Sequence, residues 1–130
     1  MGRPGVISAL GSPSVSANNM LLAATDLPPQ VFVMFVTSRV QTVQPNANGS
    51  AGILCIGGGL GRYDSPGQVS SSGPTGSVRL VADLTQHPIP FARIAVQAGE
   101  TWHFQAWHRD TVAGSSTSNF TQGLSIQFVP

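Results

Sequence analysis

Lysine is missing from this 130-residue chain, and charge of either sign is scarce. The six basic residues are all arginine, and charged residues make up 8% of the sequence against about 25% in a typical soluble domain. The net charge is +1 and the arginines form no basic run, so the electrostatic footprint of a protein that binds nucleic acid or an anionic membrane surface is absent. We therefore expect neither of those partners.

Long apolar runs are missing as well. No stretch approaches the roughly 18 apolar residues of a membrane-spanning helix, so we predict no membrane insertion. Hydrophobic residues nevertheless make up 41% of the chain, which is enough to bury the core of a domain of this length. We expect one domain over residues 1–130.

Cysteine occurs once, at position 55. A single cysteine excludes a disulfide within the chain and a four-cysteine zinc site. Cys55 stands in the apolar run Ile53–Ile56, where a thiol usually behaves as a small buried hydrophobe, and we predict a reduced, buried thiol. The histidines His87, His103 and His108 match no zinc spacing, so we expect no metal and no cofactor.

Motifs of catalysis are also absent. The sequence has no G-x-S-x-G element, and its five acidic residues stand at expected strand ends or turns. The glycine run Gly57–Gly61 lacks the Lys-Ser/Thr of a phosphate loop, and we interpret it as a flexible or bulged connection with at least one residue at positive φ. We predict that the protein is not an enzyme; a small hydrolase with a triad of scattered residues is the weakest alternative.

What is abundant points to strands. Fifteen glycines and ten prolines argue against a helical protein, and turn residues interrupt the apolar segments about every 8–15 residues. This spacing predicts an antiparallel β-sandwich, jelly-roll or immunoglobulin-like, of about seven or eight strands with no significant helix. The expected strands are Val6–Leu10, Met20–Thr25, Val31–Thr37, Gly52–Ile56, Ser77–Leu84, Thr101–Arg109 and Gly123–Val129, with Arg62–Asp64 as a brief addition.

Val31–Thr37 is continuously apolar and rich in β-branched and aromatic residues, which predicts a central strand covered on both faces. Ser77–Leu84 alternates, so we expect it to have one wet face. Three segments are expected outside the strands: Gln41–Ser50 as a hairpin loop or extended connection, Gln86–Ala98 as an extended crossover, and Thr111–Asn119 as a polar loop.

The strand Thr101–Arg109 is the most aromatic segment, and alternation divides its side chains between two faces. We expect the core to take the first face, which carries Trp102, Phe104 and Ala106. The second face carries His103, Gln105, Trp107 and Arg109. Two interpretations of the second face stay open: it packs under a loop or neighbouring sheet, or it is exposed and contacts a partner.

Several stretches resemble a C-terminal β-domain of predicted secreted proteins from planctomycetes and related bacteria. They are Gly52–Tyr63, Gly99–Asp110 and Ser118–Phe128, and Ile7–Asn19 fits as well. The resemblance covers nearly the whole chain and implies an accessory extracellular module without assigned chemistry. It also implies a second cysteine, before the first strand, as the partner of Cys55. Because no such cysteine precedes Val6 here, we expect a trimmed domain or a free-standing relative.

We therefore predict a non-catalytic structural or interaction module, extracellular or at the cell surface, that self-associates as an oligomer or filament subunit. Lysines often guard exposed sheet edges, and here the terminal strands Val6–Leu10 and Leu124–Val129 lack that guard. The predicted contact residues are those of the second face, His103, Gln105, Trp107 and Arg109. The alternative is a carbohydrate-binding module for cell-surface polysaccharide, with other extracellular domains as further partners. Its stacking platforms would be Tyr63, Trp102 and Trp107.

Overall fold

Strands make up almost all the regular structure of this protein. The computed structural model describes residues 5–112 and 114–130, apart from the side chains of Asn48 and Val112. It contains thirteen strands and one short 3-10 turn, η1 (Ala47–Gly49). Every strand runs antiparallel to the strand that it pairs with. The all-β, antiparallel sandwich is confirmed, and the strand number exceeds the prediction because the expected loops and crossover contain further strands.

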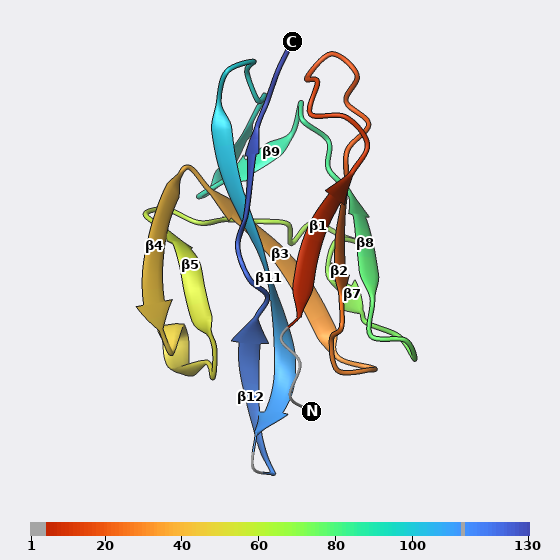
Figure 1. Ribbon diagram of the computed structural model, residues 1–130, viewed down its shortest axis with the longest axis vertical. Coiled ribbons are helices and arrows are strands. Elements are labelled where there is room, and N and C mark those ends of the chain that lie inside the picture. Colours follow the sequence, from red (N-terminus) through yellow and green to blue (C-terminus); the bar gives the residue numbers. More distant parts are fainter. Residues whose placement is uncertain (1–4, 113) are drawn as a thin grey trace.

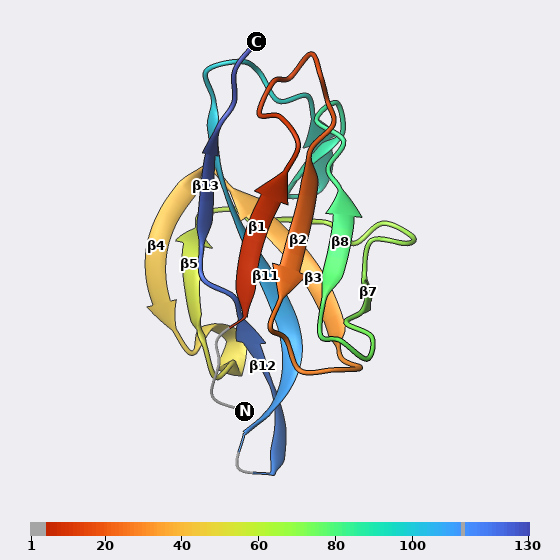
Figure 2. The same ribbon diagram turned by 45° about the vertical axis from the view of Figure 1, so that its right-hand side comes forward.

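Two sheets are stacked face to face (Figures 1 and 2). The smaller sheet has the order β1 (Val6–Leu10), β2 (Leu21–Thr25) and β8 (Val78–Val81). The larger has the order β12 (Ser115–Phe120), β11 (Thr101–Val112), β3 (Phe32–Ser38) and β6 (Gly61–Arg62). Two further strands join its sides, namely β13 (Leu124–Gln127) on β11 and β7 (Ser70–Ser71) on β3.

The main core lies between these sheets. Alternate residues of each strand point inward because successive side chains of a strand face opposite ways. The larger sheet contributes Val33, Phe35, Trp102, Phe104 and Ala106, all almost fully buried. The smaller sheet contributes Ile7, Leu22, Ala24, Val78 and Leu80. The expected core face of the aromatic strand is thus confirmed, as is the wet face of β8, where Arg79 and Val81 are exposed.

A third, partial layer covers the other face of the larger sheet. It is the hairpin of β4 (Val40–Pro45) and β5 (Ile53–Gly57), seen at the left of Figure 1. Leu54 and Ile56 pack with Val36 in a second apolar cluster, which confirms that β3 is covered on both faces except at its start, where Phe32 is 62% exposed. Cys55 points away from this cluster and is only half-buried, so the prediction of a buried thiol is wrong.

Two of the expected loops are strands. The Gln41–Ser50 segment forms most of β4, which pairs with β5 although it has almost no buried face. The Thr111–Asn119 segment lies in a hairpin, because β11 continues to Val112 and β12 starts at Ser115. This hairpin projects beyond the body of the molecule (Figure 1). Neither β4 nor β12 shows alternation of apolar and polar residues, because neither strand has one face against a core and the other in water.

The expected crossover over Gln86–Ala98 contains a short hairpin. Its strands are β9 (His87–Ile89) and β10 (Ala92–Ile94), joined by a turn at Pro90 and Phe91. No helix in the described part of the chain is long and apolar enough to cross a membrane.

Candidate functional site

The predicted interaction face of β11 is divided by the hairpin that lies over it. Gln105 is fully buried beneath β5. Its side chain accepts a hydrogen bond from the Cys55 amide at 2.8 Å and donates to the carbonyls of Ile53 at 2.8 Å and Thr121 at 2.6 Å. Gln105 is therefore a structural tie between layers, and its assignment as a partner contact is wrong because β5 covers it.

The rest of that face is partly open. Trp107 and His103 are half-buried, and Arg109 is exposed. The Arg109 guanidinium lies 5.1 Å from the centroid of the Trp107 ring, within the range of a cation–π contact. The His103 ring nitrogen Nδ1 lies 2.7 Å from the Ser125 hydroxyl. Partial burial lowers the pKa of the His103 side chain. What stays accessible is the small Trp107–Arg109 pair beside the β11–β12 hairpin.

Trp102 is not a stacking platform. Its side chain is 2% exposed, and the Arg39 guanidinium stands 4.5 Å from its ring centroid. The indole Nε1 donates to Glu100 Oε1 at 3.3 Å, while Glu100 Oε2 pairs with Arg39 at 3.0 Å. The sugar-binding assignment of Trp102 is wrong because the core takes its ring and this ion pair caps it.

Tyr63 is also unavailable to a sugar. Its amide donates to the carbonyl of Phe35, and its side chain belongs to the main core cluster. The ring is 2% exposed, and burial raises the pKa of the phenol. Tyr63 therefore belongs to the core, and only Trp107 of the predicted platforms keeps an open side.

A buried histidine connects these aromatic rings. His87 lies with Nε2 at 3.3 Å from the Thr37 hydroxyl and Nδ1 at 3.4 Å from the Tyr63 hydroxyl. Its ring centroid is 4.1 Å from that of Trp102. Burial lowers the pKa of His87 to about 4, so the ring is neutral at pH 7. His87 is fully buried and packs as a polar core residue, away from any soluble substrate.

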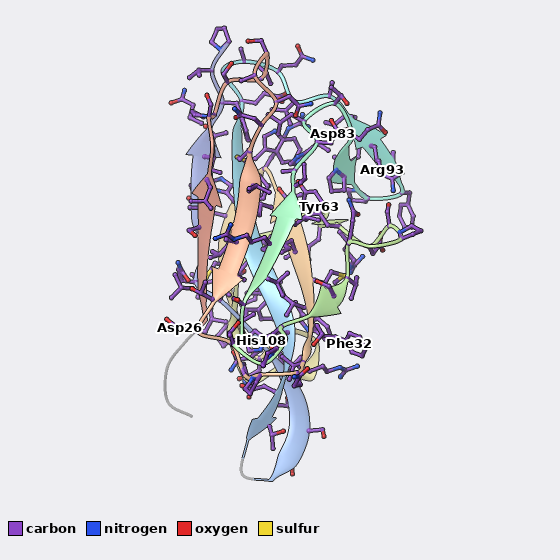
Figure 3. All side chains as sticks on the ribbon, turned by 90° about the vertical axis from the view of Figure 1, so that its right-hand side faces the viewer. Asp26, Phe32, Tyr63, Asp83, Arg93 and His108 are labelled. Carbon is purple, nitrogen blue, oxygen red and sulfur yellow. The ribbon has the colours of Figure 1, made fainter. Side chains whose placement is uncertain are left out.

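An open pocket of about 400 Å³ lies beside the β9–β10 hairpin. Its charged lining residues are Arg62, Asp64 and Arg93. Phe91, at the tip of the hairpin, also lines it, and its side chain is fully exposed. Figure 3 shows Arg93 on this hairpin at the outer margin of the molecule. The sequence analysis did not predict this pocket. The only sequence feature that marks it is the Pro88–Phe91 segment, which contains two prolines and ends in the hairpin turn.

The glycine run positions this hairpin. A Cβ atom on Gly61 would lie 2.0 Å from the Pro88 carbonyl oxygen, and one on Gly59 would lie 2.6 Å from the Pro90 ring. Both positions therefore need glycine for close approach. The expected positive φ is confirmed at Gly58, at 67°. The run thus has a packing role in holding the hairpin against β6.

Strand β4 forms a second open feature. Five of its six residues are exposed, including Val40 at 50% and Val43 at 71%. Within the described residues β4 pairs only with β5, so no strand covers its outer edge. No charged residue occurs between Arg39 and Arg62. This edge has the composition that favours strand addition.

No group of three potential metal-ligating side chains gathers anywhere in the described ranges. Comparison with protein-family models, curated proteins and solved structures finds no match to the chain. The fold and these surfaces define an all-β, sandwich-like protein, and the resemblance to the secreted β-domain stays a prediction.

Proposed function

We propose that the protein is a non-catalytic extracellular interaction module that associates with a second copy of itself through the outer edge of β4. The observation that carries the proposal is this edge, which is exposed, uncharged and unpaired by any described strand. The resemblance to a domain of secreted proteins supports the extracellular setting. The full burial of His87 supports a role other than catalysis, because a substrate could not reach its ring.

A second copy fits this edge for an electrostatic reason. When two identical antiparallel strands pair about a two-fold axis, each residue approaches a residue of the same segment. A charged strand would then oppose its own charge, whereas the segment from Val40 to Gly61 has no charge to oppose. Pairing would also cover the exposed side chains of Val40 and Val43.

The other sheet edges are less available. Gln122 occupies the open side of β1, where its amide accepts from the Ile7 N–H and donates to the Ile7 carbonyl, both at 3.1 Å. On β13, the Ser125 hydroxyl contacts His103 and Gln41. On β8, Arg79 places a charge that would face its own copy. We therefore move the proposed contact from the terminal strands to β4.

The association should be weak and reversible. The β4–β5 register shifts between Gln41 and Gln44, which marks a bulge, and Pro45 lacks an N–H. Both features shorten the edge that can pair. A short strand pair also buries less than the roughly 1,200–2,000 Å² of a stable interface. We expect a concentration-dependent dimer rather than a filament.

Sedimentation velocity over a concentration series tests the proposal with two matched lysine variants. Val43→Lys places a charge on β4, and Val81→Lys places one on β8 at a similarly exposed position, 71% against 67%. We expect the wild type and Val81→Lys to dimerise with rising concentration and Val43→Lys to stay monomeric with an unchanged circular dichroism spectrum. A wild type that is monomeric throughout, or equal loss in both variants, would overturn the β4 contact.

A further inference from the structure

We infer that the pocket beside the β9–β10 hairpin binds a carboxylated saccharide, with Phe91 stacking on the sugar ring and Arg62 and Arg93 holding the carboxylate. The inference is independent of self-association, since it uses none of the residues of β4. It assigns sugar recognition to residues other than the buried Tyr63 and Trp102.

The backbone conformation and the exposure of Phe91 are the first reason for this inference. Phe91 is the second residue of a two-residue turn after Pro90, with φ at 63°, a conformation that favours glycine. A bulky side chain there strains the backbone. The ring gains nothing in return from the fold, because it is fully exposed. An aromatic ring that is strained and solvated at the rim of a pocket is placed to contact a ligand.

The position of two arginines without ion-pair partners in the described part of the chain is the second reason for this inference. Arg62 and Arg93 line the same pocket and both are exposed. Neither forms an ion pair with any described residue, although Asp64 lines the pocket as well. Arg93 donates to the Ser65 hydroxyl, which orients its guanidinium, and Arg62 is fixed at its backbone by the pairing of β6 with β3. Guanidinium groups of this kind bind carboxylates through paired N–H donors.

Asp64 narrows the ligand class. The Asp64 carboxylate weakens the attraction of the pocket for any anionic group, and it accepts hydrogen bonds from the hydroxyl groups that a saccharide adds. The residues that line the pocket are therefore complementary to a ligand with an anionic group, several hydroxyl groups and an apolar face for the Phe91 ring. A uronic acid unit of a polysaccharide combines these three features. The pocket volume of about 400 Å³ admits such a unit and leaves it open to the continuing chain.

The first test is calorimetric titration of the full chain with an oligomer of galacturonic acid, and with the matching neutral galactose oligomer. We expect saturable binding of the acidic oligomer, weakened by added salt, and binding of the neutral oligomer at least about tenfold weaker. Arg62→Gln and Arg93→Gln should each lower the affinity about tenfold. Arg79→Gln, an exposed arginine on β8, is the matched control and should bind as the wild type does.

Phe91→Gly separates ligand binding from folding. Glycine relaxes the positive φ, so the thermal midpoint should stay or rise while the affinity for the acidic oligomer falls about tenfold. Phe32→Ala, at an exposed phenylalanine on β3 that lies well away from Arg93 in Figure 3, should leave binding unchanged.

Several results would overturn the inference. They are equal affinity for the neutral oligomer, unchanged binding by Phe91→Gly, equal competition by inorganic phosphate, and binding to phosphatidylserine vesicles without binding to the oligomer. Loss of self-association in Phe91→Gly with no saccharide binding in the wild type would also overturn it, because the ring would then serve a subunit contact.

Discussion

At the scale of single residues, the aromatic side chains range from buried rings to one ring that is fully exposed. Trp102 and Tyr63 are core residues because their strands direct them between the sheets, where His87 and Arg39 complete their surroundings. Phe91, which has no periodic pattern to mark it, is the fully exposed ring. An aromatic residue at a hairpin turn is thus a stronger pointer to a surface than one on an alternating strand.

Gly61 shows how a missing side chain shapes the pocket. We expect Gly61→Ala to lower the free energy of unfolding by about 2–3 kcal/mol, because its Cβ would meet the backbone oxygen of Pro88 at 2.0 Å and backbone cannot easily move aside. Gly58→Ala should lower it by about 1 kcal/mol, since there the main penalty is the positive φ. Urea unfolding measures both values, and equal effects at the two sites would contradict a close-packed role for Gly61.

At the scale of elements, several hydrogen bonds attach the β4–β5 hairpin to the larger sheet, and the side chain of Gln105 makes two of them. Gln105 bonds to β5 at both Cys55 and Ile53, and it also bonds to the carbonyl of Thr121. The apolar cluster of Val36, Leu54 and Ile56 lies between the same two layers. The hairpin that carries the proposed dimer edge is therefore held by the Gln105 amide, by this apolar cluster, and by the bonds of Ser38 Oγ to the Gly57 carbonyl and of the Ala51 amide to the Ser118 carbonyl.

We expect Gln105→Ala to loosen this hairpin. The free energy of unfolding should fall by about 2–3 kcal/mol, because several backbone groups lose a buried partner. Thiol-reagent labelling of Cys55 in the native protein should accelerate, since the Cys55 amide is one of those groups. The control is Gln41→Ala, whose amide bonds only to the exposed Ser125 and whose loss should change stability by no more than about 0.5 kcal/mol. Unchanged labelling in Gln105→Ala would show that the apolar cluster and the remaining hydrogen bonds hold the hairpin without Gln105.

At the scale of the whole molecule, stability should depend on pH through the buried histidine. The pKa of His87 is lowered to about 4 in the folded protein, against about 6.5 in an unfolded chain. The unfolded state therefore binds more protons than the folded state between these values, so stability falls as the pH drops through this window. From pH 7 to pH 5 the loss from this group is about 2 kcal/mol.

Urea unfolding at several pH values between 7 and 5 measures this slope. The carboxyl groups of Asp83 and Glu100 have lowered pKa values and stay mostly ionised there. His87→Gln should be less stable at pH 7 and lose most of the pH dependence. His103→Gln removes a histidine with more exposure and should keep most of it. An unchanged slope in His87→Gln would place the proton uptake elsewhere.

Sequence patterns by themselves determined the strands that lie against a core. Val31–Thr37, Ser77–Leu84 and Thr101–Arg109 were predictable because burial on one or both faces leaves an apolar run or an alternation in the residues. The antiparallel sandwich followed from those strands and from the turns between them.

Which surfaces are covered and which stay open depends on contacts between segments distant in the sequence. The strand nature of β4 and β12 was hidden because neither has a buried face. The burial of Gln105 depends on a hairpin more than forty residues earlier in the chain. The pocket depends on Arg62 of β6 and Arg93 of β10 lining the same space. Local periodicity reports how one strand meets a core, whereas these surfaces arise where segments distant in the sequence come together, and no local pattern records that contact.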